Sequence, residues 1–201
     1  MDINNQPDFF DDIDFDSLDS DIDFDQSAAC AEPFIEYDNR RYSCSFTGHR
    51  QLSQQERFML MPKLKSVILY LINCGVKEFH AGGAEGFDTL AAGVVHEISK
   101  ERDDIRLILE LPYKRSGFEK GNSRDNHIRS FIMDVADEIN YHGEKPKNYE
   151  EAVKMLYKRN RVLIDKSHYC VCFLKTKSGG TAYTVNYASL HDTSIINLAE
   201  N

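Results

Sequence analysis

Short apolar stretches alternate with longer amphipathic segments between residues 42 and 198. Apolar residues at helical spacing predict five helices, near residues 53–74, 89–98, 126–135, 148–165 and 178–190. Runs of β-branched, aromatic or continuous apolar residues predict six strands, at residues 42–46, 76–79, 105–111, 138–141, 169–174 and 194–198. Regular alternation of strands and helices is typical of α/β domains. We therefore predict a Rossmann-like, three-layer α/β domain with a mostly parallel sheet over residues 41–201.

Single residues mark the ends of the predicted elements. Ser53 and Glu56 have the spacing of a capping box, which starts the first helix, and Gly75 ends it. Pro62 falls inside the same helical pattern. Because proline lacks a backbone N–H, it predicts a kink or a division of this helix in two. The near-continuous apolar run at residues 169–174 predicts a strand at the centre of the sheet.

The composition narrows the class of protein. A chain of 201 residues with 41% apolar content is sufficient for one α/β domain. No apolar run has the length of a membrane span, and the N-terminus lacks a signal-peptide pattern, so we expect a cytoplasmic protein without a membrane segment. The five cysteines are odd in number and form no CxxC pair. We expect reduced thiols and no metal site.

The charge is divided unevenly along the chain. Residues 1–40 carry 13 acidic side chains and one basic one, for a net charge of −12, whereas the other 161 residues carry 23 bases and 20 acids, for +3. Such an excess of like charge predicts a disordered acidic arm. Asp12-Ile13-Asp14-Phe15-Asp16 recurs at residues 21–25. The arm could dock on a basic, apolar partner, or it could cover the chain's own basic site. The mild +3 suits a phosphate-bearing ligand and argues against duplex DNA.

A glycine-rich segment joins the second predicted strand to the second predicted helix. Glycines at such a junction let backbone N–H groups close around an anion at the positive end of the helix. The alternative is a tight turn that needs a positive φ. Asp88 suits the helix dipole, and it could also accept hydrogen bonds from ribose hydroxyls. The candidate binding residues of this segment are Gly82, Gly83, Ala84, Glu85, Gly86 and Asp88.

Two more polar junctions follow the first and fifth predicted strands. Parallel strands end at one edge of an open α/β sheet, where ligands bind, so we expect all three junctions to meet. Arg159 shares the buried stripe of the fourth helix with Leu156 and Leu163, which indicates either a side chain that reaches the surface or one that reaches into the site. Asn160 adds a polar group beside it. The candidate residues are Thr47, Gly48, His49 and Arg50 at the first junction, Gly179, Gly180 and Thr181 at the last, and Arg159 and Asn160.

These junctions, taken in order, resemble the YpsA-like family of the SLOG superfamily, which also contains DprA and the LOG phosphoribohydrolases. The resemblance covers roughly residues 41–199 and implies a SLOG-type Rossmann-like domain that binds a nucleotide or nucleotide derivative, such as an ADP-ribose-like ligand. It implies no required cofactor and leaves a homo-oligomer open. LOG enzymes use a helix arginine, which Arg159 matches by position, and a glutamate after their Gly-Gly pair. Here no carboxylate follows Thr181 until Asp192.

The function predicted from the sequence is therefore binding or sensing of a nucleotide derivative, without established catalysis. The first alternative is a LOG-like hydrolase of an N-glycosidic bond, with Arg159, Glu85 and Asp88 as candidate catalytic residues, since an oxocarbenium-like transition state benefits from a nearby carboxylate. The second alternative is single-stranded DNA binding, as the resemblance to DprA implies.

Overall fold

The computed structural model describes residues 40–114 and 124–199, so the acidic arm and Phe118 lie outside the described residues. All six strands are parallel, in the order β4-β3-β2-β1-β5-β6. The strands are β1 (Ser43–Gly48), β2 (Glu78–Ala81), β3 (Arg106–Leu111), β4 (Glu138–Tyr141), β5 (Tyr169–Phe173) and β6 (Ser194–Asn197). The helices are α1 (Gln54–Asn73), α2 (Phe87–Ser99), α3 (Arg124–Val135), α4 (Tyr149–Asp165) and α5 (Gly179–Ser189). The predicted Rossmann-like architecture is confirmed.

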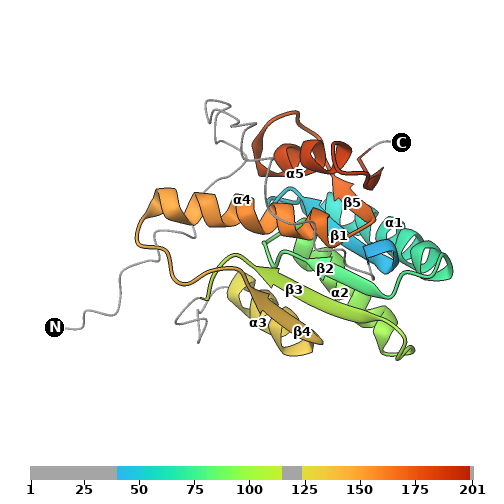
Figure 1. The fold of residues 1–201 in the computed structure, drawn as a ribbon. Helices are drawn as coiled ribbons and strands as arrows, with labels where there is room; N and C mark the ends of the chain where they lie inside the picture. Colours follow the sequence, from blue (N-terminus) through green and yellow to red (C-terminus); the bar gives the residue numbers. More distant parts are fainter. Residues whose placement is uncertain (1–39, 115–123, 200–201) are drawn as a thin grey trace.

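The order of the strands reverses once. From β1 the chain moves outward through β2 and β3 to β4, then α4 carries it back across the sheet to β5, on the other side of β1 (Figure 1). Helices α1, α2 and α3 pack on one face of the sheet, and α4 and α5 pack on the other. The point of reversal lies between β1 and β5, which is where open α/β sheets form a crevice for ligands.

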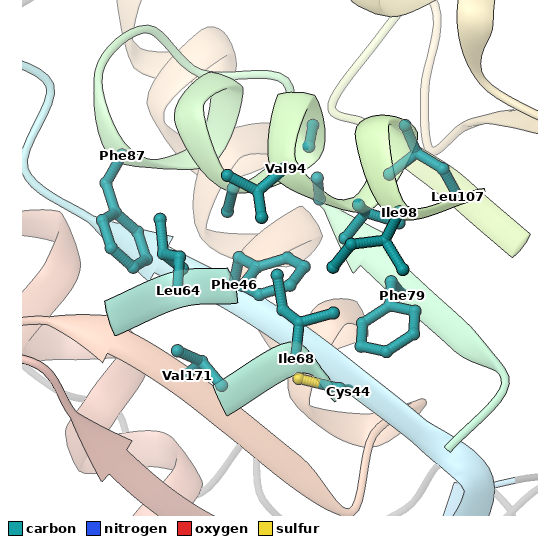
Figure 2. Close-up of a cluster of buried hydrophobic side chains, with 14 of the residues drawn as sticks. Cys44, Phe46, Leu64, Ile68, Phe79, Phe87, Val94, Ile98, Leu107 and Val171 are labelled. Carbon is teal, nitrogen blue, oxygen red and sulfur yellow. The ribbon is translucent and has the colours of Figure 1, made fainter. Parts of the chain in front are cut away.

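One face of the sheet carries the main apolar core (Figure 2). Phe46 of β1 and Phe79 of β2 stack with ring centroids 6.1 Å apart, beneath Leu64 and Ile68 of α1. Phe87, the first residue of α2, stacks on Phe173 at the end of β5, also at 6.1 Å. The start of α2 is therefore held over the central strands by two packed aromatic rings.

The alternate positions of the same strands face α4 and α5, and many of them are polar. Ser43, Ser45 and Thr47 of β1 are buried there, together with His80 of β2 and Glu110 of β3. The pattern of apolar runs did not reveal this second face. His80 and Glu110 stand singly in their strands, and the alternation of polar and apolar residues in β1 is also typical of a strand with one face in solvent. The sheet therefore has one apolar face and one face whose buried polar groups need hydrogen-bond partners.

Glu110 is the centre of a buried polar network. Its carboxylate accepts hydrogen bonds from Lys166 Nζ at 2.8 Å and Asn140 Nδ2 at 3.4 Å, and it contacts His80 Nδ1 at 3.1 Å and His142 Nε2 at 2.5 Å. Burial opposes the charged form, but the hydrogen bonds from His142, His80 and Lys166 outweigh burial and hold the pKa of Glu110 well below its usual range. This network ties β2, β3, β4 and the end of α4 together.

Several local predictions can be compared with the structure. The Ser53–Glu56 capping box is present, but α1 runs unbroken through Pro62, so the predicted division of this helix is wrong. Packing of the buried stripe against the core keeps the helix continuous despite the missing N–H. Cys44, Cys170 and Cys172 are buried, and none of the three is in a disulfide. None of the helices described is both long and apolar enough to cross a membrane.

Replacing Glu110 by Gln should cost about 3 kcal/mol of unfolding free energy at pH 7, because a buried carboxylate with several cationic or N–H partners loses its charge. The folded-state pKa of Glu110 is depressed, so its stabilisation is present above the unfolded pKa of about 4.3 and is lost as the pH falls below that value. Urea unfolding between pH 3 and 7 should show this loss in the wild type and a flatter profile in Glu110→Gln.

Glu150→Gln is the matched control, since the ion pair of Glu150 with Lys154 on α4 is exposed to solvent, which screens it and leaves it little effect on stability. The control should follow the wild type at every pH. Equal stability of Glu110→Gln and wild type at pH 7 would contradict a stabilising role for the network.

Candidate functional site

Three loops lie side by side at the carboxyl edge of the sheet. The first loop (49–53) follows β1, the second loop (82–86) follows β2, and the third loop (174–178) follows β5. These three strands are neighbours in the sheet, in the order β2, β1, β5. The three predicted junctions are therefore brought to one edge. Thr47 and Gly48 belong to β1 itself, because they pair with Cys172 and Phe173 of β5, and the strand ends two residues later than predicted.

The first and second loops are in backbone contact. Gly86 has φ +82°, and a Cβ at this position would lie 2.0 Å from the carbonyl oxygen of Arg50. Phe87 N donates to His49 O at 3.1 Å. A Cβ on Gly48 would lie 2.5 Å from the side chain of Phe87. Glycine is therefore required at residues 48 and 86 for close approach, which is a structural reason independent of any ligand.

Asp88, in the first turn of α2, contacts the second loop. Its carboxylate accepts hydrogen bonds from the backbone N–H groups of Gly82 and Ala84. Its Oδ2 lies 3.7 Å from Nη1 of Arg159, and Arg50 adds a second favourable charge. Burial nevertheless dominates and raises the pKa of Asp88 to about 6. The loop amides thus surround an anion, as the glycine pattern predicts, but this anion is the chain's own side chain.

Arg159 reaches this position from α4 and is buried, so it does not extend to the surface. A Cβ on Gly82 would lie 1.4 Å from Nη1 of Arg159, which means that only glycine leaves room for the guanidinium. Gly83 has φ +66°, and its added Cβ would lie 2.7 Å from Leu111. Glu85 and Asn160 are half-buried at the same edge.

His49 joins the first loop to the third. It is buried, and its Nε2 accepts the backbone N–H of Lys175 at 3.0 Å, while its ring meets Phe173 edge-on. A nitrogen that accepts carries no proton, so the neutral ring holds its proton on Nδ1. In this structure His49 is a link between two loops. The sequence pattern indicates it as a candidate binding residue of the first junction.

The third loop leads into a helix that no side chain caps. Ser178 is the N-cap of α5 but makes no capping hydrogen bond, and Gly179 follows with φ +89°. By contrast, Ser53 caps α1 through Glu56 N, and Asn148 caps α4 through Glu151 N. Gly180 is half-buried in the first turn of α5 and Thr181 is buried there. The positive end of α5 therefore lies at the carboxyl edge of the sheet, beside the point of reversal between β1 and β5, where it can attract an anion.

His80, Glu110, His142 and Lys166 were not among the candidate residues from the sequence. His80 lies two residues before the second loop, and its Nε2 is buried 3.9 Å from Glu78 Oε2. A lone glutamate in the apolar run at residues 105–111 was the signal that could have revealed this network. Within residues 40–114 and 124–199, no group of three or more His, Cys, Asp or Glu side chains is arranged to hold a metal ion.

Comparisons with known proteins agree with this architecture. A family model named YpsA, described as the YspA SLOG family, matches residues 51–195, which include the second and third loops and Arg159. The DNA processing protein A (DprA) of Streptococcus pneumoniae is similar with a TM-score of 0.53 and 14% identity, over 77% of this chain and 49% of that one. DprA of Helicobacter pylori, whose structure is described for its single-stranded DNA binding mode, gives the same TM-score and identity over 78% of this chain and 65% of that one.

This chain thus spans about half to two thirds of the two DprA proteins, and identity this low shows a shared fold alone. A search of the curated proteins found no match.

Gly86→Ala should destabilise the protein by about 3 kcal/mol, because a methyl group would face a backbone oxygen at a positive φ. Gly93→Ala is the control in the same helix, since nothing lies within 4 Å of its added Cβ. Alanine is the better helix former, so Gly93→Ala should stabilise by up to about 1 kcal/mol. Denaturant unfolding of both variants measures this, and equal effects would argue against contact between the two loops.

Asp88 should give the protein an unusual pH dependence. Its folded pKa of about 6 lies above the unfolded value of about 3.9, so the native state binds more protons between these values. Its contribution to stability is therefore lost as the pH rises from 4 to 7, by about 3 kcal/mol. Asp88→Asn lacks this term. From pH 4 to pH 7 the unfolding free energy of the wild type should therefore fall relative to that of Asp88→Asn. A difference that stays constant over this interval would contradict the raised pKa.

Proposed function

Because the chain belongs to the YpsA (YspA SLOG) family, we propose that it binds a nucleotide or nucleotide derivative, with a phosphate at the N-terminus of α5. The observation that carries the proposal is the contrast between helix ends. Side chains cap α1 and α4, whereas α5 begins with two glycines, no capping side chain and amides that open toward the carboxyl edge of the sheet. That arrangement favours a bound anion.

The neighbouring loops support a phosphate at α5 rather than at α2. In the second loop, Asp88 accepts the N–H groups of Gly82 and Ala84, and Phe87 N donates to His49 O. A phosphate there would have to displace a buried carboxylate and would meet its negative charge. At α5, the first turn carries no acidic side chain, and Thr181 provides a hydroxyl. Thr47 of β1 and Arg50 of the first loop lie at the same edge of the sheet.

Binding or sensing is favoured over cleavage of a glycosidic bond. Asp88 is buried and engaged by two loop amides, and Arg159 is buried against it, so the pair is built into the scaffold. Glu85 is the remaining carboxylate among the candidates in the second loop. The chain has no acidic residue between Thr181 and Asp192, on the side of the crevice where the LOG glutamate would stand. We therefore propose a ligand-binding role for this edge, without hydrolysis.

Ser178→Asp and Ser178→Asn test the proposal as a matched pair. Both residues are good N-caps, so both variants should fold and melt at or above the wild-type temperature. Asp adds a negative charge at the proposed phosphate position, and binding should weaken at least about tenfold relative to Asn, which corresponds to 1.4 kcal/mol. Thermal shift with AMP, ADP-ribose and inorganic phosphate provides the measurement, because a ligand at 100 times its Kd stabilises by about 2.7 kcal/mol.

Equal affinity of the two variants would place any bound phosphate elsewhere. The same titration with an oligo-dT separates single-stranded DNA binding, which should depend steeply on salt, from binding of a mononucleotide. Release of free base or ribose phosphate during these incubations would contradict a binding-only role and would support the glycosidic hydrolase.

A further inference from the structure

Helix α1 carries an apolar strip on its solvent side. Of the nine large hydrophobic side chains that are exposed in the described part of the chain, five lie on this helix, with exposed fractions from 37% to 77%. We call them the α1 strip: Phe58, Met59, Met61, Leu69 and Tyr70. At 100° per residue, Met59, Leu69 and Tyr70 lie on the side opposite the buried residues Leu64, Ile68 and Leu71, whereas Phe58 lies on the flank and Met61 lies at the edge beside Ile68. Exposed large apolar side chains that gather on one helix suit an interaction site.

The charges around the α1 strip are mainly positive. Arg57, Lys63 and Lys65 lie on the same helix, where Glu56 is the one acidic residue. Glu56 is already bonded to Lys175 Nζ at 2.7 Å and to the amide of Ser53, and these partners lower its pKa to about 2. Lys65 is exposed beside the strip, while Arg57 and Lys63 are half-buried on its flanks, where they donate to the carbonyls of Leu52 and Leu198. This positive surrounding suits a partner with apolar residues set among carboxylates.

The chain itself has such a segment. Residues 1–39 contain 13 acidic residues and no base, and their two Asp-Ile-Asp-Phe-Asp repeats place Ile13, Phe15, Ile22 and Phe24 between carboxylates. We propose that this arm docks on the α1 strip of its own chain, with the repeat side chains on the apolar surface and the carboxylates near Arg57, Lys63 and Lys65.

The point of attachment favours an intramolecular contact. Tyr42, which follows the arm directly, lies against the C-terminal end of α1: its carbonyl accepts Lys77 N at 2.8 Å, and its ring is 3.7 Å from the Cβ position of Gly75. The 15 residues between Phe24 and Arg40 can span up to about 50 Å. Helix α1 is about 30 Å long, so both repeats can reach any part of the strip.

A second copy of the chain fits the α1 strip less well. In a two-fold symmetric contact each strip would face its own equivalent, so the bases of one copy would approach those of the other. The arm instead brings opposite charge at a high effective concentration, because it is tethered beside the strip. This inference concerns α1 and is independent of the phosphate proposed at α5.

The experiment uses the full chain, which contains no tryptophan, so that Phe15→Trp gives a single fluorescent reporter in the arm. A docked indole should emit at a shorter wavelength than indole in water and should resist acrylamide quenching. Adding Phe58→Gln and Leu69→Gln should shift the emission to that of exposed indole and raise quenching severalfold. High salt should act in the same direction, because it screens the carboxylates from the bases.

Phe131→Gln is the control, since Phe131 is an exposed aromatic residue on α3, away from the strip, and it should leave the emission unchanged. Circular dichroism should show that all variants remain folded, because the replaced side chains are exposed. An indole that is already exposed in the parent, or protected regardless of the two α1 substitutions, overturns the proposal. Protection that disappears on dilution also overturns it, because it would assign the strip to a second copy.

Discussion

The buried contact between Asp88 and Arg159 organises the carboxyl edge of this protein. One carboxylate orients the second loop through two of its amides, and one guanidinium fills the space that Gly82 leaves open. The contact joins the start of α2 to α4, two elements on opposite faces of the sheet. Charges buried this deeply are costly unless partners surround them, so the glycines, the loop amides and the position of α4 have to agree with one another.

This constraint changes what the glycine motif means. A glycine-rich turn before a helix suggests a cradle for an external anion, yet here the second loop already encloses an internal one. The third loop also leads into a helix through a Gly-Gly pair. It differs because no carboxylate follows Gly179 and Gly180 in the first turn of α5. Two similar junctions can thus have different roles. The second loop stabilises the fold, and the start of α5 can offer its amides to a ligand.

Most of the fold could be predicted from the sequence because each helix and strand has its own local signal. The alternation of apolar runs and the Ser53–Glu56 box depend on neighbouring residues alone. The site was harder, because Asp88 and Arg159 meet only after folding, and so do His49 Nε2 and the amide of Lys175. Glu110 was missed for a related reason. A single carboxylate in an apolar strand has no pattern, and its partners come from three other elements.

Helix α4 holds two cations on one side, Arg159 against Asp88 and Lys166 against Glu110. They are seven residues apart, or about two turns, so both project toward the sheet. Sliding the helix by one turn, about 5.4 Å, would separate both cations from their partners and leave two buried acids without their ion pairs. Two ion pairs thus fix the position of α4 along its axis. A ligand that moves α4 at this edge would therefore have to tilt the helix, because both ion pairs oppose its translation along the sheet.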